Sequence, residues 1–127
     1  MKCPFGLENE YNKYLIKLEF SNLKNNLEMA ELYNKFKNYF NELIEFETDK
    51  NLIDNIRVSS KYDPIIKFYL PFRYDKFEVD FYKNNNLVTS KEICNNSYLS
   101  LDIEIPSLWY YKNNFGLNIN ITKINIK

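Results

Sequence analysis

The segment from Asn25 to Phe46 has the residue spacing of an amphipathic α-helix. Asn25 is the predicted N-cap, and Glu28 follows three residues later, where the acid of a capping box lies. A helix this long buries its apolar stripe against a surface that the rest of the chain is expected to supply. The apolar residues recur every three or four positions, so that they form one stripe: Met29, Leu32, Tyr33, Phe36, Phe40, Leu43 and Ile44.

The residues ahead of this helix predict a β-strand. Apolar side chains occupy every second position from Tyr14 to Phe20, and charged residues stand between most of them. A helix over residues 11–20 is the alternative interpretation. It places Ile16 and Phe20 on its polar side, whereas a strand misplaces only Leu15, so the strand is preferred.

The region after the helix predicts short extended segments. The stretch Thr48–Asn55 is interpreted as a transition with room for one extra helical turn, and a short strand is expected over Asn55–Ser59. A further strand is predicted over Ile65–Leu70, between Pro64 and Pro71. Prolines at both ends indicate an edge strand or a strand that ends sharply.

The second half of the chain begins with a predicted hairpin. The segments Phe77–Phe81 and Leu87–Ile93 flank a turn at Asn84–Asn86. Asparagine adopts the left-handed backbone conformation more readily than most residues, so it can replace glycine in such turns. A chain with only two glycines can therefore still reverse direction several times.

Two more strands are predicted near the end of the chain. Leu99–Ile105 alternates strictly and is expected to end at Pro106, and the chain is expected to turn again at residues 113–116. The final strand begins at Leu117. Its period-two pattern slips by one residue near positions 122–123, which predicts a β-bulge there.

These elements predict one α+β domain over residues 1–127. In this domain one long amphipathic helix packs on an antiparallel β-sheet of about five to seven strands, and an N-terminal strand precedes the helix. A sandwich-like arrangement of the sheet stays open. The length of 127 residues suits a single domain, and a hydrophobic content of 45% is that of a globular chain.

Charge and composition narrow the expected partners and location. The chain has 17 basic and 17 acidic residues, so it lacks the overall electrostatic footprint of a general nucleic-acid binder. Nucleic acid is therefore not the favoured partner, although a local basic patch is compatible with these numbers. No apolar leader opens the chain and no stretch is long enough to cross a bilayer. A cytoplasmic protein without a membrane partner is expected, with Cys3 and Cys94 as reduced thiols.

The residue inventory removes the common catalytic constellations. Histidine is absent, which excludes Ser-His and Cys-His nucleophilic machinery and most zinc sites. Two glycines are too few for a phosphate-cradling loop, and no P-loop, dinucleotide-binding or nucleophile-elbow motif is present. No catalytic residue, cofactor or metal ligand is predicted, and the chain is not expected to be an enzyme.

One candidate contact site is an acidic stripe on the exposed side of two predicted strands. Such a stripe is first an ordinary solvated face with lysines beside it, second a surface for a basic partner, and third a place where paired carboxylates hold a divalent metal. Like charges across neighbouring strands cost stability, so a bare stripe would need a compensating reason. The stripe consists of Glu78, Asp80, Asp102 and Glu104.

The other candidate site is aromatic. Three consecutive aromatic side chains cannot all point inward, so at least one of residues 109–111 is expected to be exposed. Exposed Trp, Tyr and Arg carry much of the binding energy of protein interfaces, and aromatic rings also stack on bases. Ordinary core packing is the alternative. The candidate residues are Trp109, Tyr110, Tyr111, Arg73 and Tyr74, the last two within an aromatic segment over residues 68–74.

Three functions remain compatible with the sequence. The leading hypothesis is a non-catalytic protein that occupies the surface of another protein: an inhibitor, an immunity or anti-defence protein of a phage or mobile element, or an accessory subunit. The second is a module that binds single-stranded nucleic acid or carbohydrate by aromatic stacking. The third is a subunit that buries its aromatic residues against copies of itself.

Overall fold

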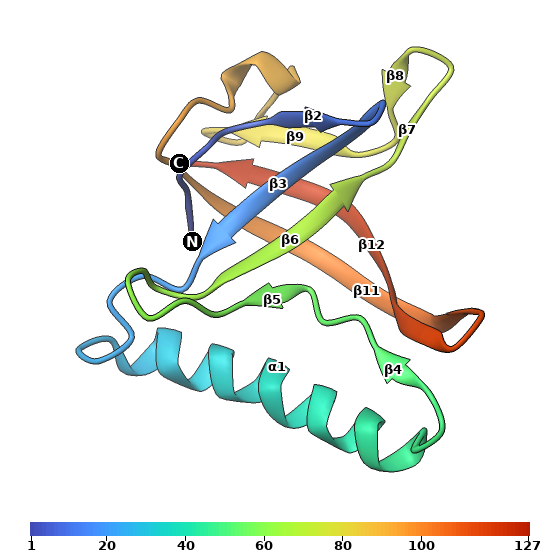
Figure 1. The fold of residues 1–127 in the computed structure, drawn as a ribbon. Coiled ribbons are helices and arrows are strands. Elements are labelled where there is room, and N and C mark those ends of the chain that lie inside the picture. The colour runs from blue at the N-terminus through green and yellow to red at the C-terminus, as the bar shows by residue number, and fades with distance from the viewer.

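The computed structural model describes all residues from Met1 to Lys127 and has an α+β fold (Figure 1). It contains one α-helix, α1 (Leu27–Phe46), and a short 3-10 helix, η1 (Ser90–Glu92). Strands precede the helix, as predicted. The strands are β1 (Lys2–Cys3), β2 (Glu8–Glu10), β3 (Lys13–Glu19), β4 (Asn51–Leu52), β5 (Ile56–Arg57), β6 (Ile65–Leu70), β7 (Phe72–Arg73), β8 (Lys76–Phe77), β9 (Asp80–Lys83), β10 (Asn86–Val88), β11 (Ser97–Tyr111) and β12 (Asn114–Ile126).

Ten of the strands form one mostly antiparallel sheet. Its order is β10-β9-β12-β11-β1-β3-β6-β5, with β2 paired to β3 and β4 paired to β12, while β7 and β8 form a separate hairpin. Only β4 and β9 pair in parallel, both with β12. Strand β6 also approaches β12, although three strands separate them in the sheet, so the sheet curls back on itself (Figure 1). The strands outnumber the predicted five to seven because several have only two or three residues.

Helix α1 lies along one open side of the curled sheet and covers its interior (Figure 1). Phe40 is 1% exposed, and Phe20 at the end of β3 contacts Tyr33 and Phe36 edge to face. The stripe is narrower than predicted, because Ile44 is 51% exposed. The remaining predicted stripe residues are partly buried against the core: Met29, Leu32, Tyr33, Phe36 and Leu43.

The N-cap of the helix lies one residue later than predicted. Asn26 is the N-cap, and its side-chain oxygen accepts a hydrogen bond from the backbone N–H of Met29 at 3.1 Å. The predicted cap, Asn25, instead donates its backbone N–H to Asn22, so it belongs to the preceding turn. Either asparagine could cap from its residue type alone, and the geometry of the incoming turn decides between them.

The long β11–β12 hairpin differs most from its prediction. Strand β11 does not end at Pro106 but continues through it, within a bulge that separates Glu104 from Ser107 in the pairing with β12. A bulge leaves residues without a ladder partner, so a proline, which has no N–H, is tolerated there. The hairpin turns at Lys112, whose φ is 55°, and Asn113. The predicted turn residue Asn113 is therefore confirmed, whereas Asn114 and Gly116 already belong to β12. The slip predicted at residues 122–123 is confirmed, because Thr122 is the residue skipped between two paired neighbours.

The remaining short elements match the sequence patterns in part. The β9–β10 hairpin turns at Asn84 and Asn85, whose φ values of 53° and 63° are left-handed, as predicted. Its strands differ from the prediction: the segment 77–81 is divided between β8 and β9, and the segment 87–93 is a strand only to Val88 and then forms η1. No extra helical turn forms after the helix, because residues 51–52 pair with β12 as β4. Strand β6 is not an edge strand, since β3 and β5 flank it.

Both cysteines are free, as predicted. Cys3 is buried and Cys94 is exposed. Burial is the main cause that raises the pKa of the Cys3 thiol to about 11. Helix α1, the one long helix of the chain, is too polar to cross a membrane.

We predict that Phe40→Ala lowers the free energy of unfolding by about 3–5 kcal/mol, because it empties a fully buried site. Ile44→Ala, one turn later on an exposed position, is expected to change it by less than about 1 kcal/mol. Urea denaturation followed by circular dichroism measures both variants. Equal losses in the two variants would contradict the observed orientation of the helix.

Candidate functional site

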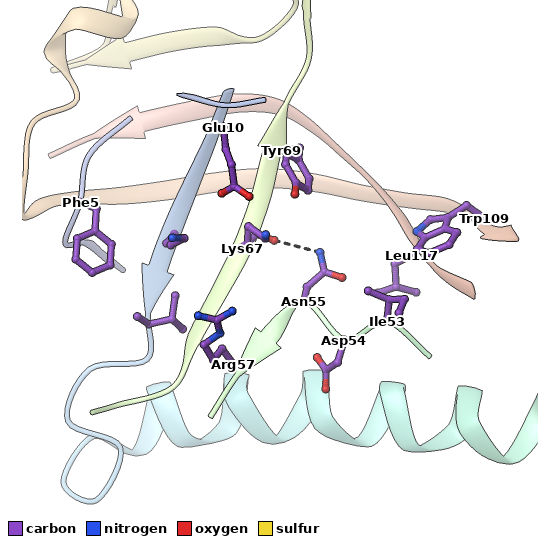
Figure 2. Close-up of a pocket in the computed structure, with 12 residues that line it drawn as sticks. Phe5, Glu10, Ile53, Asp54, Asn55, Arg57, Lys67, Tyr69, Trp109 and Leu117 are labelled. Carbon is purple, nitrogen blue, oxygen red and sulfur yellow. Dashed lines mark hydrogen bonds between the residues drawn. The ribbon is translucent and has the colours of Figure 1, made fainter. Parts of the chain in front are cut away.

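A concavity lies on the outer face of the sheet formed by β3, β6 and β5. It has a volume of about 620 Å³, and we call it the outer groove. Figure 2 shows Phe5 at one end, Trp109 at the other, and Lys67, Asn55 and Arg57 between them. The chemically active lining side chains are the aromatic Phe5, Tyr69 and Trp109, the cationic Lys17, Arg57 and Lys67, and the acidic Glu10 and Asp54.

The pairing of β3 with β6 positions the centre of the groove. Alternate residues of these strands enter the core, including Ile16 and Phe68, and the residues between them face outward. Lys17 and Lys67 are directly opposite in this register. Directly opposed like charges destabilise a strand pair, so the ladder holds two cations together against their mutual repulsion.

The acidic residues near the groove neutralise it only in part. Lys17 Nζ lies 3.5 Å from Glu8 Oε2, which offsets one of the two opposed lysines. Asp54 is engaged elsewhere, because one of its oxygens accepts from Lys37 Nζ at 3.3 Å and the other from the Ile56 N–H at 2.7 Å. Lys67 and Arg57 form no ion pair in the structure, so they are the free positive charges of the groove.

Backbone and side-chain bonds hold the floor of the groove in place. Asn55 Nδ2 donates to the carbonyl of Lys67 at 3.1 Å, and the Lys67 N–H donates to the carbonyl of Asn55 at 3.0 Å (Figure 2). These two bonds extend the pairing of β5 with β6. They place Arg57 on the strand beside that of Lys67.

Two aromatic rings of the groove lie beside its lysines. Tyr69 is 44% exposed, and its ring has Lys67 Nζ at 5.2 Å and Lys13 Nζ at 5.5 Å from its centroid. Phe5 is 52% exposed and has Lys17 Nζ 5.6 Å from its centroid. Each ammonium thus lies within the range of a cation–π interaction, and the rings remain accessible to a ligand.

Trp109 forms the far end of the groove because Gly116 makes room for it. The two residues are directly opposite in the β11–β12 pairing. A Cβ atom on Gly116 would lie 2.6 Å from the indole ring, so the ring lies directly on the glycine backbone. This glycine therefore serves close packing rather than the predicted turn.

The other two residues of the aromatic run are both exposed, and Tyr110, at 50%, also makes structural contacts. The Tyr110 hydroxyl donates to Glu47 Oε1 at 3.2 Å, and the Tyr110 ring stacks on Phe115. Desolvation, followed by the hydrogen bond and charge of Glu47, raises the pKa of Tyr110. Tyr110 thereby ties the hairpin tip to the end of α1. Tyr111 is 65% exposed, as expected for at least one residue of this run, and lies against Lys112.

The predicted pair Arg73 and Tyr74 lies at a second site, the tip of the β7–β8 hairpin. Tyr74 is 89% exposed, and Tyr11 at the β2–β3 turn is 91% exposed. Both tyrosines adopt positive φ, 53° and 52°, in two-residue turns. The ring centroids of Tyr14 on β3 and Phe72 on β7 are 4.7 Å apart, so the strands beside these two turns are in contact. We call Tyr11 and Tyr74 the tyrosine tips.

The acidic stripe is interrupted by a lysine. Lys123 of β12 is directly opposite Asp102 of β11 on one side and Asp80 of β9 on the other. Glu104 lies opposite Asn120, and Glu78 Oε1 is 3.7 Å from Arg73 Nε. The four carboxylates therefore lie on a face of mixed charge.

No three His, Cys, Asp or Glu side chains converge as a metal-binding group. The outer groove combines cations with accessible rings. Such an arrangement can hold an anion through the cations and a flat apolar group through the rings.

The central cations of the groove, Lys17, Arg57 and Lys67, were not among the sequence-predicted site residues. Lys17 and Lys67 each occupy an outward position of a correctly predicted strand, but alternation within a strand does not reveal which strand lies beside it. Trp109 was a predicted site residue, and Tyr69 lies within the predicted aromatic segment over residues 68–74.

Comparison with protein-family models gives no match for this chain. Comparisons with curated proteins and with solved structures also give none.

We predict that Gly116→Ala displaces the Trp109 ring, because the added methyl group would occupy its position. The emission of Trp109, the only tryptophan, is expected to shift to the red, and the free energy of unfolding to fall by about 1–3 kcal/mol. Asn120→Ala, at an exposed position of the same strand, is the control. Unchanged emission in Gly116→Ala would contradict the packing of Trp109 on the glycine.

Proposed function

We propose that the protein is a non-catalytic binding protein that holds an extended, negatively charged partner in the outer groove. The observation that carries this proposal is the opposition of Lys17 and Lys67 across β3 and β6, with Lys67 and Arg57 free of any ion pair. Glu8 offsets Lys17 only, and an anionic group beside Lys67 would remove the repulsion that remains between the two lysines. The bound partner would thus compensate for a charge arrangement that costs the free protein stability.

The size and openness of the groove favour an extended partner over a compact one. The groove crosses three neighbouring strands, with Phe5 and Trp109 at its two ends and Tyr69 between them beside Lys67 (Figure 2). The zero net charge of the chain does not oppose this binding, because charges more than about 8 Å away are largely screened at physiological salt. The local charges of the groove therefore decide what it attracts.

Charge reversal in the groove tests this proposal. Lys67→Glu combined with Arg57→Glu is expected to weaken binding of an anionic polymer by about tenfold or more at low salt, where charges are least screened. The probes are inorganic polyphosphate, poly-glutamate and an oligothymidylate, and the emission of Trp109 at the end of the groove reports binding.

The matched control is Lys24→Glu with Lys35→Glu, two exposed lysines outside the groove whose reversal changes the net charge equally. This control is expected to retain binding. Equal weakening in both double variants, or no binding of any probe by the unaltered protein, would contradict the proposal.

A second candidate function is contact with another protein through the tyrosine tips. The observation that favours it is the almost complete exposure of Tyr11 and Tyr74 in left-handed turns beside Arg73. A bulky side chain adopts this conformation at a cost, and exposed Tyr and Arg carry interface energy. An inhibitor, an immunity or anti-defence protein, or an accessory subunit would use such a surface on its target.

The double variant Tyr11→Ala and Tyr74→Ala tests this second function. Affinity purification from the native host is expected to recover a protein that the variant loses, because each hot-spot tyrosine contributes about 2 kcal/mol. The control is Tyr62→Ala with Tyr98→Ala, which removes two tyrosines that are 75% and 55% exposed at other positions. Recovery of the same protein by both variants would contradict contact through the tips. Light scattering on the purified chain tests self-association separately.

A further inference from the structure

We infer that the partner of the outer groove is single-stranded nucleic acid. The inference rests on the proposed function, because it names the class of anion that the groove binds. It depends on one further feature, the exposed aromatic rings that lie beside the cations of the groove: Phe5 beside Lys17 and Tyr69 beside Lys67.

The cations are arranged to follow a phosphate backbone. Lys17, Lys67 and Arg57 stand on the three adjacent strands β3, β6 and β5, which neighbour each other about 5 Å apart in the sheet. A chain of phosphates that crosses these strands would meet one cation on each. A single phosphate or carboxylate would use only part of this row.

The exposed rings of the groove are not needed to bind a phosphate backbone, so they indicate a ligand that also has flat apolar groups. Phe5 and Tyr69 keep 52% and 44% of their surface exposed, although burial of aromatic surface is favourable. Nucleic-acid bases stack on such rings irrespective of sequence, and the charged residues beside the rings hold the backbone. An acidic peptide or a polyphosphate would leave the rings uncovered.

A duplex fits this arrangement less well than a single strand. The bases of a duplex are stacked on each other and their faces are not available to Phe5, Tyr69 or Trp109. In a single strand the bases can turn toward the protein while the phosphates lie on the cations. The groove is therefore expected to prefer unpaired strands.

Fluorescence anisotropy of a labelled oligothymidylate of about ten nucleotides tests the inference. The single strand is expected to bind at least about tenfold more tightly than a duplex, polyphosphate or poly-glutamate. With three phosphates neutralised, the logarithm of the affinity should fall with the logarithm of salt concentration with a slope of about −2. An abasic oligonucleotide of equal length is expected to bind about tenfold more weakly.

Tyr69→Ala is expected to weaken oligonucleotide binding by about tenfold and to leave polyphosphate binding unchanged. Phe5→Ala, at a more exposed position, provides the same measurement if Tyr69→Ala fails to unfold cooperatively. Tyr111→Ala is the control, since that exposed ring lies outside the groove.

Two other outcomes separate this inference from the proposal on which it rests. Equal affinity for the oligonucleotide, the abasic strand and poly-glutamate would overturn the inference and leave the anion-binding function in place. The absence of binding to every anion would overturn both. Stronger binding to the duplex would also overturn the preference for single strands.

Discussion

The antiparallel pairing of β3 with β6 is the constraint on which the interior and the outer groove both depend. This register runs over six residue pairs and joins segments that lie on opposite sides of helix α1 in the sequence. Because side chains alternate along a strand, the same pairing sends Ile16, Leu18, Ile66 and Phe68 into the core and sends Lys17 and Lys67 outward. A slip of one residue would exchange these two faces. Burial of the apolar face thus fixes where the opposed lysines stand.

The helix and the long hairpin complete the enclosure that this register begins. Helix α1 covers the open side of the curled sheet with Phe36 and Phe40, and Tyr110 at the hairpin tip bonds to Glu47 at the end of the helix. The same hairpin presents Trp109 to the end of the outer groove, because Gly116 leaves space for its ring. The elements that close the core therefore also shape the outer surface.

The net charge of the protein is a poor guide to the local charge of its surface. The acidic and basic residues are equal in number, yet their arrangement differs from place to place. Lys123 stands between Asp80 and Asp102 and balances the acidic stripe, whereas Lys67 and Arg57 have no acidic partner. Screening limits the reach of each charge to about 8 Å, so a partner responds to these local arrangements rather than to the sum.

The sequence by itself determined the elements whose cause is local. The three-and-four spacing of apolar residues specified α1, and the alternation of apolar residues specified β3 and much of β11. The flanking prolines delimited β6, and the asparagine pair specified the β9–β10 turn. The slip at Thr122 was likewise visible as a break in period. Each of these signals lies within a few residues of the structure that it produces.

The tertiary structure alone decided which strands are neighbours, and with that the candidate site. Strand β11 continues past Pro106 because a bulge interrupts its pairing with β12 at that residue. The role of Gly116 depends on the indole ring of Trp109, which lies against it. The opposition of Lys17 and Lys67 likewise exists only after β3 and β6 pair. Residues that are distant in the sequence meet through burial of a shared apolar face. The burial of apolar surface brings the faces of two strands together. The spacing of residues within one strand does not determine which side chains of the other strand will lie opposite them.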